Sequence, residues 1–196
     1  MTQQEFLNII FQKDMAEHLS HHLVYGTLQD FLTGEELTDT DDERHRQQIS
    51  RMMVDARGYR TQDLEPRLFI ETLFTRNFVR STIDLTVTID GRQFMIIRYG
   101  PGSLVSRERS ALAAARLLNS RYRIPLAVVT NARDALLLDT VTGKVLKEGM
   151  ECIPTREEAV RLIPHLVFLP PQDKEKRVRE QRILNAFDLE RCCIGI

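Results

Sequence analysis

Residues 82–102, which read TIDLTVTIDGRQFMIIRYGPG, constrain the fold of this chain more than any other stretch. Two apolar runs rich in β-branched residues, 83–89 and 94–99, flank Asp90-Gly91, a dipeptide that strongly indicates a β-hairpin. The chain must leave the sheet after the second run, because Pro101 has no N–H to donate to a strand ladder. The first run carries Asp84, so a carboxylate lies on the hairpin close to the place where the sheet ends.

The segments that follow the hairpin predict an α/β domain. Residues 103–122 have the helical period, with Ala111, Leu112 and Ala115 on the stripe that should be buried. Short apolar runs at 126–130, 136–139 and 145–146 are typical of strands, and residues 67–75 form a further strand before the hairpin. A helix that connects two strands of one sheet implies at least one parallel pair. We therefore expect a mixed central sheet flanked by helices.

A further helix is expected immediately before the sheet. Thr40 is a suitable N-cap, and the acidic residues Asp42 and Glu43 in the first turn would stabilise the helix dipole. Gly58 is the residue type expected just past the C-terminus of such a helix. The segment 25–37, which precedes this helix, is expected to be a loop or a short helix because Gly26 and Gly34 interrupt it.

Both ends of the chain predict helical extensions around a central core. We expect an N-terminal helical extension at 1–37, a core at 38–150 and a C-terminal helical extension at 151–196. His18 and His22 have the spacing of helical metal ligands, but no third ligand completes a motif, so a solvated helix end is expected. The last charged segment begins at Gln172, ends at Arg191 and has a narrow apolar stripe. This stripe would pack either on the domain or on a second copy of the chain, which would make a homo-oligomer.

Composition excludes several classes of protein. The net charge is -1, so no global basic field points to a polyanion, and any binding of nucleic acid would have to be local. The three cysteines have no metal-ligand spacing, and their odd number argues against a disulfide framework. No stretch reaches the 18 apolar residues typical of a membrane span. We expect a cytoplasmic protein that does not enter the membrane.

The hairpin and the helix before it resemble the core of PD-(D/E)xK nucleases. The particular form is similar to the N-terminal nuclease domain of type I restriction enzyme R subunits and their stand-alone relatives. The resemblance covers residues 41–145 and implies a restriction-endonuclease-like fold, with a metal-dependent DNA-cleaving site on the hairpin. The residues that carry it are Asp84 on the first strand, Pro101 after the second strand, Arg46-Gln47 on the preceding helix and Gly58-Tyr59 before the first strand.

The second strand departs from the pattern of this family. Where the family has Glu-x-Lys, this chain has Ile97 and Tyr99. Hydrolysis of a phosphodiester by this chemistry needs carboxylates that hold Mg²⁺ and a basic group that orients the attacking water. Arg98 cannot replace the lysine, because neighbouring residues of a strand point to opposite faces. No lysine occurs between residues 14 and 143, which argues against a lysine supplied by another element of the core.

The resemblance leaves Asp84, Glu43 and Glu71 as carboxylates of a remnant site, with Asp84 as the metal ligand if any metal binds. Each has a structural explanation too: Glu43 as a first-turn acid, Glu71 as a solvated strand residue and Asp84 as a partner of Arg80. Arginines near the hairpin could form a local surface for nucleic acid, since arginine commonly contacts phosphate groups. These arginines are Arg80, Arg98, Arg107 and Arg109.

Three functions therefore remain open. The first is a catalytically degenerate nuclease-like module that needs no cofactor and binds DNA or a protein partner. The second is an active Mg²⁺-dependent endonuclease with an unconventional site built on Glu43, Glu71 and Asp84. The third is a structural or oligomerising protein that associates through its C-terminal helix.

Overall fold

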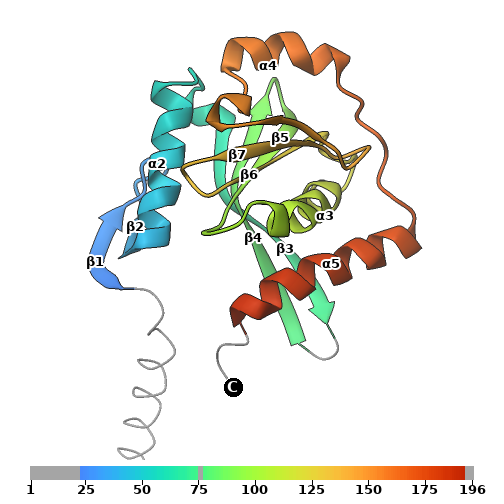
Figure 1. The fold of residues 1–196 in the computed structure, drawn as a ribbon, viewed down its shortest axis with the longest axis horizontal. Helices are drawn as coiled ribbons and strands as arrows, with labels where there is room; N and C mark the ends of the chain where they lie inside the picture. The colour runs from blue at the N-terminus through green and yellow to red at the C-terminus, as the bar shows by residue number, and fades with distance from the viewer. Residues whose placement is uncertain (1–22, 75–76, 193–196) are drawn as a thin grey trace, which may run out of the picture.

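A six-stranded mixed sheet with helices on both faces forms the centre of the computed structural model, which describes residues 23–74 and 77–192 (Figure 1). The strands follow one another in the order β3-β4-β5-β6-β7-β8, and a separate two-stranded sheet pairs β1 with β2. The strands are β1 (Val24–Gln29), β2 (Glu36–Thr40), β3 (Leu64–Phe74), β4 (Asn77–Ile89), β5 (Arg92–Tyr99), β6 (Leu126–Thr130), β7 (Ala135–Asp139) and β8 (Val145–Glu148). The α-helices are α2 (Asp41–Asp55), α3 (Glu108–Leu118), α4 (Arg156–Leu162) and α5 (Lys174–Cys192).

The central hairpin is confirmed. Strands β4 and β5 pair in antiparallel fashion, and the turn residues Asp90 and Gly91 both have positive φ angles, 50° and 74°. This is the backbone form that a two-residue hairpin turn requires, and it explains why Asp-Gly stands there. The expected parallel pair is β5 with β6, which α3 connects, and the other neighbours in the sheet are antiparallel.

Each face of the sheet has its own apolar core. On one face α2 and α4 pack through Met53 and Ala159 against strand residues that include Phe94 and Ile97. On the other face α3 and Leu184 of α5 pack against residues that include Ile96. The alanines of α3 are fully buried, because a side chain this small lets the helix lie close to the strands. The hairpin is thus covered on both sides by helices that come from distant parts of the chain.

The segment 25–37 is not a loop or a short helix. It contains most of the β1–β2 hairpin, so the described part of the N-terminal extension is a β structure. Gly34, with a φ of 74°, forms the turn, and the Asp30 carboxylate accepts hydrogen bonds from the backbone N–H groups of Leu32 and Thr33. Gly26 lies at an irregularity in the pairing and does not end the strand. The two glycines therefore shape a hairpin, whereas sequence reasoning took them as breaks. The helix expected before Val24, with His18 and His22, lies outside the described residues.

The C-terminal helix α5 packs on the domain. It lies alongside α3 and against β3 and β4 (Figure 1). Polar contacts add to the buried Leu184: Thr72 donates to Asn185 at 2.6 Å, and Arg116 pairs with Glu180 at 2.7 Å. Of the two arrangements left open for the apolar stripe, the structure shows contact with the domain. Neither α5 nor any other described helix combines the length and the apolar character needed to cross a bilayer.

Candidate functional site

A hollow of about 310 Å³ opens where β4 extends beyond β5, and we call it the Asp84 hollow. The paired residues of these strands end at Leu85 and Ile97, so Asp84 is the first residue of β4 beyond the β5 ladder. Helix α2 borders the hollow on one face of the sheet and α5 on the other. Four arginines and three carboxylates from the described residues line it: Arg46, Arg67, Arg80, Arg98, Glu43, Asp84 and Asp188.

Both carboxylate oxygens of Asp84 have a partner. Arg46 Nε donates to Asp84 Oδ1 at 2.5 Å, and the backbone N–H of Tyr99 donates to Oδ2 at 2.8 Å. The same guanidinium reaches Glu43 Oε2 through Nη1 at 3.4 Å. Burial disfavours the charged form of Arg46, but the charge and hydrogen bond of Asp84 outweigh it and raise the pKa of Arg46. A permanent cation therefore bridges two of the three carboxylates predicted for this site.

Ile97 and Tyr99 lie in the core beneath α2, not in the hollow. Their exposed fractions are 0% and 3%, and both belong to the apolar cluster that includes Met53, so the two side chains share a face of the sheet. The Tyr99 hydroxyl donates to Asp42 Oδ1 at 3.2 Å. Burial, together with the charge and hydrogen bond of Asp42, raises the pKa of Tyr99 to about 12. A phenol held neutral in this way cannot supply the positive charge of a lysine.

Arg98 points to the opposite face, as strand geometry predicts. It donates to Ser110 Oγ at 2.6 Å and to Asp188 Oδ1 at 2.9 Å, and only 7% of it is exposed. The second carboxylate oxygen of Asp188 is buried without a hydrogen-bond partner among the described residues. Sequence reasoning missed Asp188. The available signal was its position one helical turn after Leu184, on the buried side of α5.

Of the remaining predicted residues, Arg80 lines the hollow, whereas Glu71, Arg107 and Arg109 do not. Glu71 is not among the residues that line the hollow, and it pairs with Arg80 at 2.9 Å on the exposed side of β3 and β4. Arg80 is thus the partner of Glu71, not of Asp84 as suggested above, and its guanidinium lies 4.0 Å from the centre of the Phe69 ring. Arg107 donates to the carbonyl of Pro101 at 2.8 Å, whereas Arg109 is exposed on α3.

Asp30 connects the β1–β2 hairpin to the domain through Arg67, one of the residues that line the hollow. Asp30 is 4% exposed, and its carboxylate accepts hydrogen bonds from Arg67 Nη1 at 2.6 Å and Gln47 Nε2 at 2.8 Å. Burial opposes ionisation of Asp30, but the hydrogen bonds from Arg67, Gln47 and Thr33 prevail and lower its pKa to about 2. Gln47 also donates to Glu43 Oε1 at 2.9 Å, so this network helps to position the carboxylate that Arg46 contacts.

The comparison with known families finds one matching family model. Residues 41–154 match the family model described as the type I restriction enzyme R protein N terminus. The chain belongs to this R-protein N-terminal family. The matched region includes Glu43, Arg46 and Asp84, whereas Asp30 and Asp188 lie outside it. No curated protein and no solved structure matches the chain.

The residues at the Asp84 hollow do not fit the divalent metal that R-protein N-terminal nucleases imply. The Arg46 guanidinium already contacts Asp84 and Glu43, and a second cation there would be repelled by it. The strand position that would hold the next carboxylate has the buried Ile97. Within 23–74 and 77–192, no group of three histidine, cysteine, aspartate or glutamate side chains is arranged to hold a metal ion.

Proposed function

We propose that this member of the R-protein N-terminal family is a catalytically degenerate nuclease-like module that binds nucleic acid. The observation that carries the proposal is the Arg46 guanidinium, which bridges Asp84 and Glu43. An arginine held there offsets part of the carboxylate charge that a metal would neutralise, but it has no open coordination position for a water or a phosphate oxygen. The hydrocarbon of Ile97 and the neutral phenol of Tyr99 remove the other groups that cleavage needs.

Loss of cleavage is tested with supercoiled plasmid DNA incubated with the purified chain and Mg²⁺ or Mn²⁺. We expect no metal-dependent nicking by the wild-type chain, and no difference between it and an Asp84→Ala variant. Metal-dependent nicking that disappears in the Asp84→Ala variant would instead establish the active endonuclease and reject the degenerate site.

Binding of nucleic acid is supported by the arginines around the hollow. The lining has one more arginine than it has carboxylates, although the whole chain carries a net charge of -1. Arg80 has a side chain that is 61% exposed and is the most accessible of these groups. Its guanidinium lies over the ring of Phe69, a residue that is 46% exposed, and a cation beside an exposed aromatic residue suits contacts with phosphates and bases. The basic character is therefore local, as the composition requires.

The DNA-binding prediction concerns Arg80, with Arg161 as a matched control. Both are exposed arginines that pair with a glutamate, Arg80 with Glu71 and Arg161 with Glu157, but Arg161 lies on α4 away from the hollow. Arg80→Ala is expected to weaken binding of a fluorescein-labelled duplex about three- to tenfold and to reduce the slope against salt concentration by about one. Fluorescence anisotropy over a salt series measures both quantities.

Equal losses in Arg80→Ala and Arg161→Ala would mean that the effect is one of overall charge and not of a site. Absence of salt-dependent binding by the wild-type chain would reject nucleic acid as the ligand and leave a protein as the partner of the module. The plasmid assay is independent of this result, because a degenerate site can exist with either kind of partner.

A further inference from the structure

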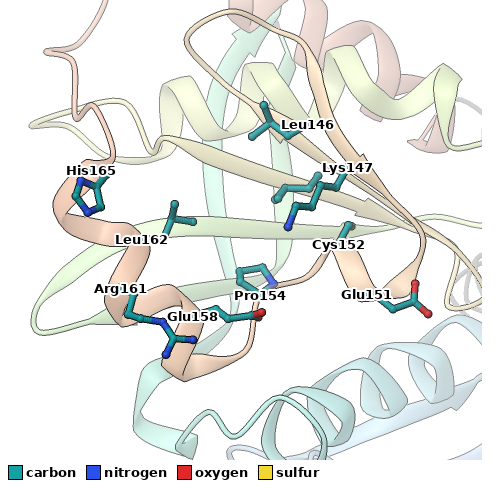
Figure 2. Close-up of a pocket in the computed structure, with 10 residues that line it drawn as sticks. Leu146, Lys147, Glu151, Cys152, Pro154, Glu158, Arg161, Leu162 and His165 are labelled. Carbon is teal, nitrogen blue, oxygen red and sulfur yellow. The ribbon is translucent and has the colours of Figure 1, made fainter.

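A second pocket lies between α4 and the β7–β8 end of the sheet, at the edge opposite to β3 (Figure 2). Its volume of about 410 Å³ falls in the range typical of small-molecule sites. No residue of the Asp84 hollow lines this pocket, which we call the α4 pocket. A ligand of the α4 pocket would therefore bind independently of the nucleic acid proposed for the Asp84 hollow.

The inner part of the α4 pocket is apolar. Leu137, Leu162 and Pro154 line it together with Cys152, and Leu146, which is 52% exposed, adds further apolar surface. Burial raises the pKa of the Cys152 thiol to about 11, so this sulfur is a neutral, weakly polar part of the lining at neutral pH. A ligand that enters the pocket must therefore bring an apolar group of moderate size.

An irregularity in the edge strand places two neighbouring residues of β8 at this pocket. Leu137 pairs with Lys147 and Leu138 pairs with Val145, so Leu146 is an extra residue in the ladder. Such a bulge re-aims side chains that would otherwise alternate between faces. Leu146 and Lys147 consequently both line the pocket, as Figure 2 shows.

Two side chains of opposite charge border the apolar part. The Lys147 ammonium makes no ion pair or hydrogen bond with any described residue, and the Glu158 side chain uses only its Oε2 oxygen, which accepts bonds from the backbone N–H and the hydroxyl of Thr155 at 2.7 and 3.1 Å. These bonds come first in lowering the pKa of Glu158, and the charges of Lys147 and Arg161 contribute to the same shift. The ammonium and the carboxylate thus act on each other across the pocket without an ion pair between them.

The other charged groups of the lining are engaged or directed elsewhere. Arg161 pairs with Glu157 at 2.6 Å, one helical turn away on α4. The carboxylate of Glu151 points away from Lys147 (Figure 2). Lys147 and Glu158 are therefore the pair that can meet a ligand over the apolar lining.

We propose that the α4 pocket binds a free α-amino acid with an apolar side chain, whose carboxylate pairs with Lys147 and whose ammonium pairs with Glu158. The two ligand charges lie on one carbon, so a single small molecule can satisfy both protein charges and place its side chain against Leu137, Leu146 and Leu162. A simple fatty acid or an alkyl amine would leave one of the two protein charges without a partner.

The test is isothermal titration calorimetry of the full chain with L-leucine and with two analogues that each lack one charge. These are 4-methylpentanoate, without the ammonium, and 3-methylbutylamine, without the carboxylate. Leucine is expected to bind about tenfold more tightly than either, because each analogue loses one charge-assisted hydrogen bond. Saturable binding of 4-methylpentanoate or 3-methylbutylamine as tight as that of leucine would overturn the proposal, as would no saturable binding of leucine.

Variants of the two charged residues locate the binding. Lys147→Met keeps the apolar stem and Glu158→Gln keeps an acceptor for the cap of α4, so neither is expected to unfold the chain. Each should weaken leucine binding about tenfold. Lys144→Met and Glu148→Gln change exposed residues of the same hairpin outside the pocket lining and should leave binding unchanged. If Lys144→Met and Glu148→Gln weaken leucine binding as much as Lys147→Met and Glu158→Gln do, leucine does not bind between Lys147 and Glu158.

Discussion

Replacement of Arg98 by methionine is expected to lower the free energy of unfolding by about 3–5 kcal/mol. The change removes the guanidinium that pairs with the buried carboxylate of Asp188. The other oxygen of this carboxylate already lacks a hydrogen bond among the described residues, so the charge would lose its remaining cationic partner. Removal of one partner of a buried ion pair is costly because the remaining charge keeps its desolvation penalty. Urea denaturation followed by far-ultraviolet circular dichroism measures the effect.

Two further variants separate this cause from a general loss of packing. Arg98→Met combined with Asp188→Leu removes both charges and should recover most of the lost stability. Arg80→Met removes an exposed arginine that also pairs with a carboxylate, and it should cost less than about 1 kcal/mol. If Arg98→Met costs no more than Arg80→Met, the pair between β5 and α5 is not a stabilising contact.

Replacement of Asp30 by alanine is expected to cost about 3 kcal/mol of stability. This carboxylate is buried and accepts hydrogen bonds from Arg67, Gln47 and the backbone of the β1–β2 turn, and these donors would be left without it. Glu35→Ala is the matched control, because Glu35 pairs with the same arginine at 2.7 Å but has a side chain that is 65% exposed. The control should cost less than about 1 kcal/mol. Similar losses in both variants would contradict a special role of the buried carboxylate.

The lowered pKa of Asp30 should also make the stability of the chain depend on pH. The pKa of Asp30 is lowered to about 2 in the folded chain, below its value in an unfolded chain. Its contribution is therefore fully present above about pH 4 and is lost as the pH falls from about 4 to about 2. The contribution of ionised Asp30 to the free energy of unfolding that is lost over this interval is about 2 kcal/mol. The difference in stability between the wild type and Asp30→Ala should shrink over this interval, and a difference that stays constant would contradict the assignment.

Elements with strong local signals were predictable from the sequence. The Asp90-Gly91 turn, the helix after Thr40 and the buried strand of residues 126–130 form as expected, because backbone geometry and local periodicity specify them. The β1–β2 hairpin was missed since its strand residues are mostly exposed and show no clear apolar alternation. Its turn is held by Asp30, whose partners Gln47 and Arg67 are far away in the sequence.

The candidate site was predictable only in its outline. Asp84, Glu43 and the replacements Ile97 and Tyr99 follow from the resemblance of the hairpin and the helix before it to the R-protein N-terminal nucleases. That Arg46 occupies the space between Glu43 and Asp84 depends on the distance between α2 and β4, which no sequence spacing reveals. The place of Asp188 beside Arg98 likewise depends on where α5 packs.

The sequence by itself determined the hairpin, the faces of β5 and the absence of the family's Glu-x-Lys, because these depend on residues that are neighbours along the chain. Only the tertiary structure decided which charges meet: Arg46 with Asp84, Arg98 with Asp188 and Arg67 with Asp30. The physical reason is that each of these pairs joins residues far apart in the sequence, so no local spacing specifies it. The partner of each charge is selected by burial, where a charge without a counter-ion is costly, and burial is set by the packing of helices against the sheet.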